Sequence, residues 1–365
     1  MATSAHMSRA LALARKARFQ TSPNPMVGAV LVSDGVVLGD GFHRRAGGPH
    51  AEIIAIRRAG ARARGATLYV SLEPCSHQGR TGPCTSAIIA AGVARVVVAM
   101  RDPDPRVNGR GVKELRAHGI AVEVGDGAKE AEALNQRWLL SRRSGRPFVG
   151  LKFAASLDGK IAARGGDSRW ITGAEARRRG HLLRQAYDAV AVGAGTVMAD
   201  NPELTSRPAG STPSGRQPLR VVVDGRLRVA PGARVFDGDL PGRSLLATTA
   251  AADRRRGGKL RQSGVDIRAY PGDGRIDIVG LLQSLAAEGI SSVLVEGGGD
   301  LGWSFVSSGT VDQVYAFLAP KLVGGRDAVP AVGGEGFADL AGALQLRFVS
   351  QRALGDDVLL EAVPA

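Results

Sequence analysis

The chain has 365 residues, of which 44% are apolar, and this is enough to bury two ordinary cores, so we expect two domains. No apolar run reaches the roughly eighteen residues of a membrane-spanning helix, and no basic segment followed by an apolar one opens the chain, so we expect neither a membrane nor a secreted protein. The net charge is +14, but the basic residues are mostly arginines spread along the whole chain, and only 4% of residues are aromatic. These features favour a compositional bias over a nucleic-acid surface.

The first half of the chain alternates predicted helices and strands, which is typical of a layered α/β sheet. Two apolar segments flank Asp34-Gly35, a strong turn signal, and predict a hairpin of strands over 27–33 and 36–42. The other expected elements are helices over 8–18, 50–64, 84–91, 112–118 and 130–141 and strands over 67–73, 95–100 and 120–124.

The clearest chemical motif lies between His50 and Cys84. Cys75 and Cys84 are the only two cysteines, and with His50 they form a ligand set that suits Zn²⁺. Three protein ligands leave a fourth position for water, as in catalytic sites. Glu52 stands where the zinc deaminase signature places its proton-shuttling glutamate, although here eight residues separate the cysteines instead of two. The sequence therefore predicts a zinc site of the deaminase type.

A second α/β pattern follows the linker 144–147. The domains are therefore expected to span residues 1–145 and 146–365. The late strands alternate around Gly355 and are expected to be antiparallel. The expected elements are strands over 148–155, 189–193, 219–224, 244–248, 292–296, 311–319, 344–351 and 357–363 and helices over 174–186, 276–287 and 300–307.

A glycine-rich turn follows the predicted strand over 292–296. Gly297, Gly299 and Gly302 satisfy G-x-G-x-x-G, which lets a phosphate approach the backbone at a helix N-terminus. A dinucleotide-binding Rossmann unit would also need an acidic residue at the end of the next parallel strand, and Asp312 begins that strand instead. The turn therefore indicates a phosphate site in another α/β frame, or only a tight connection. Periodicity alone leaves open which nearby polar residues face the glycine-rich turn.

The motifs of both halves together are similar to those of the bifunctional riboflavin-biosynthesis family, in which a diaminohydroxyphosphoribosylamino-pyrimidine deaminase is fused to a 5-amino-6-(5-phosphoribosylamino)uracil reductase. The resemblance spans about residues 8–362. In the first half it rests on N-P-M-V-G-A-V (24–30), G-x-H-x-x-A-G-x-P-H-A-E (41–52), L-E-P-C-S-H-Q-G-R-T-G-P-C (72–84) and D-P-D-P-R-V-N-G-R-G (102–111). In the second half it rests on K-F-A-A-S-L-D-G-K-I-A (152–162), S-R-W-I-T (168–172), G-A-G-T-V-M-A-D-N-P-E-L-T-S-R (193–207) and V-E-G-G-G (295–299).

The resemblance implies a cytidine-deaminase-like α/β/α domain followed by a dihydrofolate-reductase-like α/β domain, with zinc and NADPH as cofactors. It places the zinc ligands on His50, Cys75 and Cys84 and the catalytic carboxylate on Glu52. The deaminase substrate would contact Asn24, His43, Arg80, Asp102 and Asp104. NADPH would contact Ala154, Trp170, Thr196, Asp200, Gly298, Gly299, Asp300, Leu301, Gly302, Trp303 and Ser304. The reductase substrate would contact Lys152, Ser168, Arg184, Leu204, Arg207 and Glu296.

The chain departs from the family pattern at two of these places. Many relatives have asparagine where this chain has Asp104, and some have a coenzyme-contacting serine where it has Gly225. The proton donor of the reduction is open among Lys152, Asp200 and Glu296. The strength of the preference for NADPH over NADH is also open.

Two other functions compete with this expectation. A nucleic-acid base deaminase with a basic docking domain would need steeply salt-dependent binding of RNA or DNA. A zinc-stabilised scaffold would need a fourth protein ligand, for which His77 and His43 are the candidates. We expect a cytoplasmic enzyme that acts on a small molecule, binds neither nucleic acid nor membranes, and forms a homo-oligomer, either a dimer or a tetramer. Two cysteines suited to a metal favour a reducing compartment.

Overall fold

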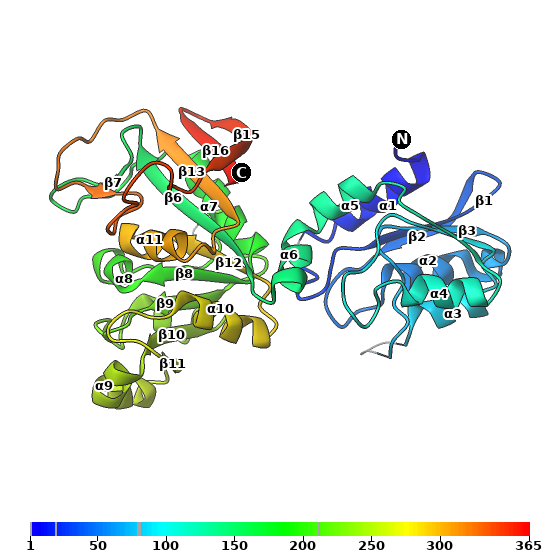
Figure 1. The fold of residues 1–365 in the computed structure, drawn as a ribbon, viewed down its shortest axis with the longest axis horizontal. Coiled ribbons are helices and arrows are strands. Elements are labelled where there is room, and N and C mark those ends of the chain that lie inside the picture. The colour runs from blue at the N-terminus through cyan, green and yellow to red at the C-terminus, as the bar shows by residue number, and fades with distance from the viewer. Residues whose placement is uncertain (1, 19, 79–81, 211) are drawn as a thin grey trace. The chain divides into compact units, whose positions relative to one another are not determined.

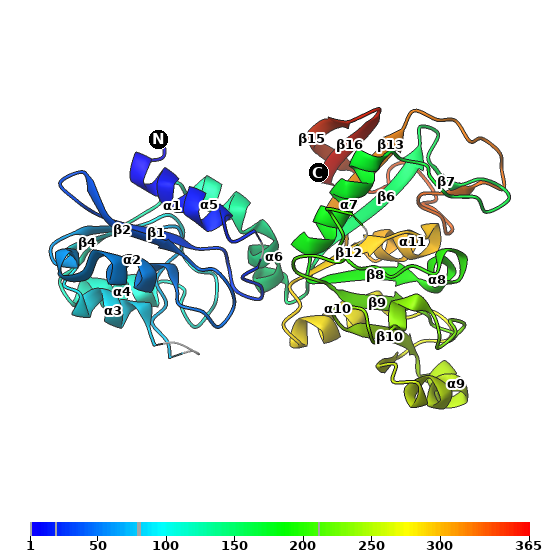
Figure 2. The ribbon, with the colours of Figure 1, turned by 180° about the vertical axis from the view of Figure 1, so that it is seen from behind.

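The computed structural model describes residues 2–18, 20–78, 82–210 and 212–365. The chain divides into two compact units, Met1–Gly145 and Arg146–Ala365, which Figures 1 and 2 show from opposite sides. Each unit has its own sheet and its own core, as expected for a chain of this length. In the described part of the chain, no helix is both long and apolar enough to cross a membrane.

The first unit is built on a five-stranded sheet in the order β2-β1-β3-β4-β5. The predicted hairpin is confirmed: β1 and β2 pair antiparallel around Asp34 and Gly35, which both have a positive φ. The strands β3, β4 and β5 pair parallel, so their carboxyl ends lie at one edge of the sheet. The strands are β1 (Gly28–Ser33), β2 (Val36–Phe42), β3 (Thr67–Val70), β4 (Arg95–Val98) and β5 (Ala121–Val124).

Helices cover both faces of this sheet (Figure 1). One core cluster joins one face of the strands to α2, α3 and α4, and another joins the opposite face to α1, α5 and α6. The layered α/β/α arrangement is thus confirmed. The helices are α1 (Ala5–Arg15), α2 (Ala51–Ala59), the short 3-10 helix η1 (Gly60–Ala63), α3 (Cys84–Ala90), α4 (Arg110–Ala117), α5 (Ala128–Leu134) and α6 (Gln136–Ser144).

The prediction of a single helix over 130–141 is wrong, because the segment is helical but Asn135 divides it into two helices, α5 and α6. The Asn135 side chain accepts a hydrogen bond from the Met26 backbone N–H at 2.8 Å and donates one to the Met26 carbonyl at 3.0 Å. This tertiary contact holds the loop that contains Asn24 and outweighs the helical pattern of the segment. The first helix also begins earlier than expected, at Ala5, because Ser4 caps it and Met7 is fully buried.

The second unit has a nine-stranded sheet in the order β11-β10-β9-β8-β12-β6-β13-β16-β15. The pairs from β11 to β13 are parallel, and the antiparallel pairing expected for the last two strands is confirmed. Short strands β7 and β14 form a separate pair. The strands are β6 (Phe148–Ser156), β7 (Lys160–Ala162), β8 (Ala189–Gly193), β9 (Leu219–Val223), β10 (Ser244–Thr249), β11 (Ile267–Tyr270), β12 (Ser292–Glu296), β13 (Gln313–Ala319), β14 (Val329–Pro330), β15 (Leu346–Leu354) and β16 (Asp357–Pro364).

Alternate residues of these strands face two different core clusters. Ala189 and Ala191 pack in the cluster that contains α10 and α11, whereas Val190 and Val192 pack in the cluster that contains α8 and α9. The sequence pattern does not predict α8, α9 or β11. The helices are α7 (Ala174–Ala186), α8 (Ala194–Asp200), the 3-10 helix η2 (Arg234–Phe236), α9 (Ala250–Gln262), α10 (Ile278–Ala287) and α11 (Gly299–Ser307).

Candidate active sites

The predicted zinc ligands come together in the first unit. His50 is the N-cap residue of α2, Cys75 lies in the loop after β3, and Cys84 is the first residue of α3. The His50 Nδ1 atom lies 3.1 Å from the Cys84 Sγ and 3.6 Å from the Cys75 Sγ, and the three ligand atoms are all within 4.8 Å of one another. One nitrogen and two sulfurs at this spacing fit a tetrahedral zinc ion with a fourth position open.

The groups of this cluster shift one another's pKa values. The hydrogen bond from Cys84, assisted by His50, lowers the pKa of Cys75 to about 4. The same hydrogen bond and burial raise the pKa of Cys84, and the hydrogen bond to Cys75 raises the pKa of His50. The cluster thus already favours one thiolate, which is the form that binds a metal.

Glu52 lies beside this cluster in the first turn of α2 and is only 4% exposed. Burial raises the pKa of its carboxyl, and the charge of His50 partly opposes this effect. A buried carboxyl with a raised pKa can both accept and return a proton near neutral pH, as general acid–base catalysis requires.

Asn24 and His43 adjoin the cluster from the side of the β1–β2 hairpin. The His43 ring packs edge-on against His50 with centroids 5.4 Å apart, and its Nε2 lies 3.1 Å from the Asn24 Nδ2. Its Nδ1 lies 3.1 Å from the Pro49 carbonyl. Burial lowers the pKa of His43, so the ring is neutral, donates to Pro49 and accepts from Asn24. Both ring nitrogens therefore have hydrogen-bond partners, and among the described residues His43 is not part of the metal cluster.

Asp102 and Asp104 lie in the loop after β4, and Glu73 holds this loop. The Glu73 carboxylate is 3% exposed and accepts hydrogen bonds from the backbone N–H groups of Asp102, Gly109 and Val112 at 3.3, 3.0 and 3.1 Å. Two of these donors belong to the N-terminal end of α4. Since Glu73 is two residues before Cys75, it joins the metal-binding loop to the Asp102 loop. The sequence reasoning gave Glu73 no role.

The two aspartates have opposite electrostatic settings. Burial raises the pKa of Asp102 to about 6, whereas a two-point ion pair with Arg106, at 2.7 and 3.0 Å, lowers the pKa of Asp104 to about 2. The aspartate that replaces the family's usual asparagine is thus neutralised by a neighbouring arginine. Arg80 lies outside the described residues, and among those described His77 is not part of the metal cluster.

In the second unit, a buried charge cluster joins three of the predicted substrate residues. Arg184 of α7 donates two hydrogen bonds to Glu296 at the end of β12, at 2.9 and 2.8 Å, and a third to the Thr205 carbonyl at 2.9 Å. The Lys152 Nζ of β6 lies 3.9 Å from the same carboxylate. Because two adjacent strands and one helix meet here, residues far apart in sequence share one site.

The pKa values of this cluster separate the candidate proton donors. Burial acts to raise the pKa of Glu296, but Arg184 and Lys152 outweigh it and lower that pKa to about 2. Glu296 is therefore ionised at neutral pH and has no proton to donate. Burial lowers the pKa of Lys152, so its ammonium group is a stronger acid than that of an ordinary lysine.

His181 joins this cluster, although it belongs to none of the sequence motifs. Its Nδ1 accepts a hydrogen bond from the Arg207 N–H at 3.2 Å, and burial together with Arg184 lowers its pKa to about 4. Arg207 forms an ion pair with Glu203, and Leu204 between them is buried with a positive φ. The signal that could have revealed His181 is its spacing of three residues from Arg184 on one helix face.

Ser168, Trp170 and Asp200 lie near one another at the end of α8. The Ser168 hydroxyl donates to Asp200 at 3.4 Å, and Arg169 donates to the Asp200 carbonyl at 2.8 Å. The Trp170 ring is 63% exposed and stacks on Arg177, with 4.5 Å between the guanidinium carbon and the ring centroid. These side chains therefore form a polar, solvent-exposed surface at the end of α8 and not a buried cluster.

The glycine turn after β12 has the geometry expected of a phosphate site. Gly298 is the N-cap residue of α11 with a φ of 81°, and a Cβ added there would lie 3.1 Å from the Thr196 hydroxyl. Thr196 comes from α8, so the turn and α8 lie against each other. The free N–H groups of the α11 N-terminus and the small turn residues fit a dinucleotide's phosphates. The other predicted coenzyme residues are placed on α11 or β6, namely Gly299, Asp300, Leu301, Gly302, Trp303, Ser304 and Ala154.

Comparison with known proteins identifies both units. Residues 2–100 match the cytidine and deoxycytidylate deaminase zinc-binding region, and residues 147–360 match the RibD C-terminal domain. The chain is 43% identical to the riboflavin biosynthesis protein RibD of Escherichia coli, over 99% of each chain, and 43% identical to that of Bacillus amyloliquefaciens, over 98% of this chain and 95% of the relative.

Solved structures give the same result. The chain resembles Acinetobacter baumannii RibD with a TM-score of 0.88 at 37% identity, covering 99% of this chain and 98% of that one. It resembles a Thermotoga maritima diaminohydroxyphosphoribosylaminopyrimidine deaminase/5-amino-6-(5-phosphoribosylamino)uracil reductase with a TM-score of 0.84 at 37% identity and the same coverage. Because the RibD match covers residues 147–360, the alternative of a nucleic-acid docking domain is wrong.

The expected fold class is therefore confirmed in both halves. The deaminase match includes the ring of zinc-compatible ligands, and the reductase match includes the glycine turn and the Arg184–Glu296 pair. The chain belongs to the RibD family of bifunctional riboflavin biosynthesis proteins, with a zinc-dependent deaminase followed by an NADPH-dependent reductase.

Proposed function

We propose that residues 1–145 deaminate 2,5-diamino-6-(5-phosphoribosylamino)pyrimidin-4-one and that residues 146–365 then reduce the ribosyl group of the product to ribityl. The observation that carries the first step is the buried Glu52 beside the His50, Cys75 and Cys84 ligand atoms. Zinc, when bound by these three residues, supplies a water of lowered pKa. Mass spectrometry of the zinc-loaded chain incubated with this pyrimidine, first alone and then with NADPH, tests both half-reactions.

In the deaminase, Glu52 moves the protons. Its carboxylate accepts a proton from the attacking water and delivers it to a ring nitrogen of the pyrimidine. It then passes a second proton to the departing amino group, so that one water is consumed and one ammonia is released. Asn24, His43, Arg80, Asp102 and Asp104 position the ring and the phosphoribosyl group. A neutral Asn24–His43 pair suits a polar heterocycle, because it offers hydrogen bonds without a fixed charge.

In the reductase, Lys152 is the proton donor. NADPH supplies the hydride, which goes to the sugar carbon of the ring-opened, imine-like form of the substrate. The Lys152 ammonium gives the balancing proton to the imine nitrogen. Glu296, which is itself held by Arg184, lies 3.9 Å from that ammonium and orients it. Ser168, Leu204 and Arg207 line the substrate side. Ala154, Trp170, Thr196, Asp200 and residues 298–304 line the coenzyme side.

Glu73 acts on the deaminase through the loops that it joins. Replacing Glu73 by glutamine is expected to destabilise the first unit by about 1–3 kcal/mol, because an amide cannot accept all three backbone hydrogen bonds. Deamination should fall while the zinc content stays near one per chain. Urea unfolding and a deaminase assay would measure both effects. The control is Glu123→Gln, which removes an exposed surface carboxylate of the same unit and should change neither quantity. An E73Q protein as stable and active as E123Q would contradict this role.

We also propose that the chain forms a homo-oligomer, a dimer or a tetramer, through β15. This strand is an edge of the nine-stranded sheet and exposes Leu346, Phe348 and Val349. An exposed apolar edge strand is a template for pairing with a second chain. Phe348→Asp is expected to lower the molar mass measured by sedimentation to that of one chain. An unchanged mass in this variant would contradict the use of β15.

A reducing compartment such as the cytoplasm is part of the proposal, because Cys75 and Cys84 can bind zinc only in their reduced form, as thiolates. Neither cysteine is in a disulfide. The sulfurs lie close enough to the same histidine nitrogen that oxidation would remove two of three metal ligands at once.

A further inference from the structure

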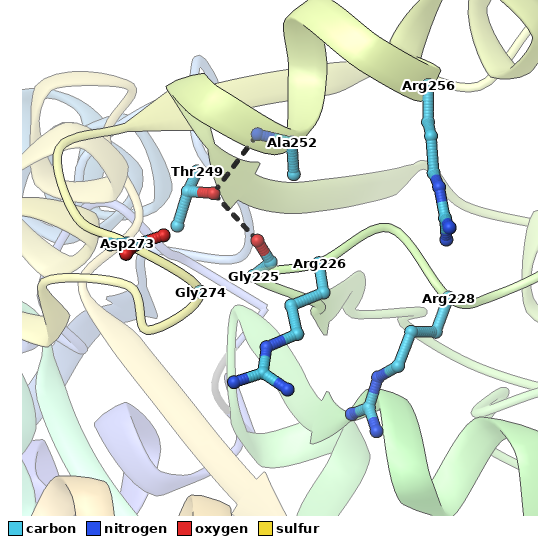
Figure 3. A pocket seen from close by; sticks show the side chains of 8 residues that line it. All are labelled: Gly225, Arg226, Arg228, Thr249, Ala252, Arg256, Asp273 and Gly274. Carbon is cyan, nitrogen blue, oxygen red and sulfur yellow. Dashed lines mark hydrogen bonds between the residues drawn. The ribbon is translucent and has the colours of Figure 1, made fainter.

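Some arginine side chains near the candidate sites have no role so far. Arg226, Arg228 and Arg256 line a pocket of about 440 Å³ in the second unit (Figure 3). This pocket follows the strands β9 and β10, at the sheet edge that also carries the glycine turn, so it belongs to the reductase site already described. The case of Arg106 in the first unit is different, because this residue lies beside the deaminase site without belonging to the metal cluster.

Arg106 forms a planar, two-point contact with Asp104. Its Nε and Nη2 atoms donate to the two carboxylate oxygens at 3.0 and 2.7 Å, and its backbone N–H donates to one of them at 2.9 Å. The Asp104 side chain is 11% exposed, whereas that of Arg106 is 64% exposed. The carboxylate is therefore covered and fixed in orientation, while the outer edge of the guanidinium group stays in contact with solvent.

The loop that carries this ion pair lies against the loop that carries Cys75. The Asp104 backbone N–H donates to the Asp102 carboxylate at 2.8 Å, and the Asp102 backbone N–H donates to the Glu73 carboxylate at 3.3 Å. Glu73 is two residues before Cys75. The two loops follow the adjacent parallel strands β3 and β4, so both lie at the carboxyl edge of the sheet. Two aspartates thus lie in one loop beside the candidate metal site.

The charges around these aspartates come from three segments of the first unit. The hydrogen bonds from Arg106 are the main cause that lowers the pKa of Asp104 to about 2, and the charge of Arg142 on α6 acts in the same direction. Burial raises the pKa of Asp102 to about 6, and the charges of Asp104 and Glu73 also act to raise it. Asp104 is therefore ionised at neutral pH, and Arg106 is the cation that is hydrogen-bonded to it.

The substrate of the proposed deamination is an anion, since a phosphate monoester carries a charge of about −1.5 to −2 near neutral pH. Like charges brought together in a binding site weaken binding and exclude ligands of the wrong charge. An uncompensated Asp104 would therefore disfavour a phosphorylated pyrimidine more than a neutral one. The ion pair with Arg106 balances the charge of the aspartate while its carboxylate stays in place.

We infer that Arg106 is a positioning residue that sets the substrate specificity of the deaminase: by balancing the charge of Asp104, it lets the site accept a phosphorylated pyrimidine. The inference rests on the proposed deamination and deepens it, because it names a residue that acts through Asp104 and not on the reacting atoms. Its consequence is that the defect of a chain without Arg106 can be repaired by removal of the Asp104 charge.

The test is the rate of ammonia release by the full-length, zinc-loaded chain, with the phosphorylated pyrimidine and with the same ribosylamino compound lacking the phosphate. Arg106→Gln should raise KM for the phosphorylated substrate about tenfold and leave kcat within about twofold, because the unbalanced charge acts on binding. KM for the unphosphorylated compound should change by less than about twofold, since it lacks the repelled group. The zinc content should stay at one ion per chain.

A second variant and a matched control complete the test. The double variant D104N/R106Q removes both charges and keeps the shape of the aspartate, so it should restore KM for the phosphorylated substrate to within about threefold of the unmodified value. The control is Arg101→Gln, which removes the same charge from an exposed residue of the same loop without unbalancing Asp104. It should change neither KM.

Three results would overturn the inference. One is an R106Q protein with the KM of the R101Q control. A second is an equal rise of KM for both compounds, which would show general damage to the loop. A third is a D104N/R106Q protein that binds the phosphorylated substrate as weakly as R106Q, which would show that Arg106 contacts the substrate itself. By contrast, an unmodified chain that releases no ammonia from either compound would contradict the proposed deamination.

Discussion

Replacing Glu52 by glutamine is expected to lower the deamination rate by about a thousandfold, within the range that general acid–base groups contribute. Glutamine has nearly the same shape but can neither accept the proton of the water nor return it to the leaving group. Glu52 is buried, its carboxyl has a raised pKa, and it lies in the first turn of α2, two residues after His50, which supports the proposed role. The measurement is the rate of ammonia release with the diaminopyrimidine substrate.

Two further readouts make this result specific. Zinc content, measured by elemental analysis, should stay at one ion per chain, because Glu52 is not among the three ligand residues. Reduction of separately supplied deaminated substrate should also be unchanged, because the reductase residues lie in the other unit. A Glu52→Gln protein that keeps its zinc and still releases ammonia at more than about a tenth of the normal rate would contradict the proton-shuttle role.

Replacing Lys152 by methionine is expected to lower the rate of reduction by about a hundredfold or more. The variant removes the proposed proton donor but leaves the two hydrogen bonds from Arg184 to Glu296, so the second unit should remain folded. The measurement is NADPH oxidation in a single turnover with the deaminated substrate. The control is Lys259→Met, which removes an exposed lysine on α9 and should leave the rate unchanged.

The pH dependence of the reduction separates Lys152 from a carboxyl donor. The protonated form of Lys152 is the active one, and burial lowers its pKa below that of an ordinary lysine. The rate of reduction should therefore be constant on the acid side of that lowered pKa and fall as pH rises through it. A carboxyl donor would also be active in its protonated form, but its rate would already fall as pH rises through the acidic range, where a carboxyl group loses its proton. A full rate for Lys152→Met, or a pH profile that Lys152→Met leaves unchanged, would contradict the assignment.

Much of the fold could be predicted because the local signals agree with the tertiary structure. The hairpin at Asp34-Gly35 and the parallel strand over 292–296 have strong turn signals and continuous apolar runs, and both are confirmed. The helix α9 was missed because Ala250–Gln262 is rich in arginine and glycine and has a weak apolar face. The break at Asn135 was missed because its cause is a contact with Met26, 109 residues away.

In the candidate sites, too, residues with a local sequence signal could be predicted, and residues placed by tertiary contacts could not. His50, Cys75 and Cys84 could be predicted as a group because few residue types bind zinc and the spacing narrows the choice. Glu73 could not be predicted, because a carboxylate that accepts backbone hydrogen bonds has no sequence signature. His181 has only the weak signal of its three-residue spacing from Arg184 on one helix. The protonation state of Glu296 likewise could not be predicted, because it depends on an ion pair with Arg184 of another element, α7.

The most direct test of the whole account is mass spectrometry of the zinc-loaded chain incubated with 2,5-diamino-6-(5-phosphoribosylamino)pyrimidin-4-one, first alone and then with NADPH. We expect an amino-to-carbonyl mass change without the coenzyme, followed by a gain of two hydrogens when NADPH is added. The first change without the second would contradict the reductase assignment of the second unit. No change in either sample, with zinc confirmed in the protein, would contradict the proposed substrate and the role of Glu52.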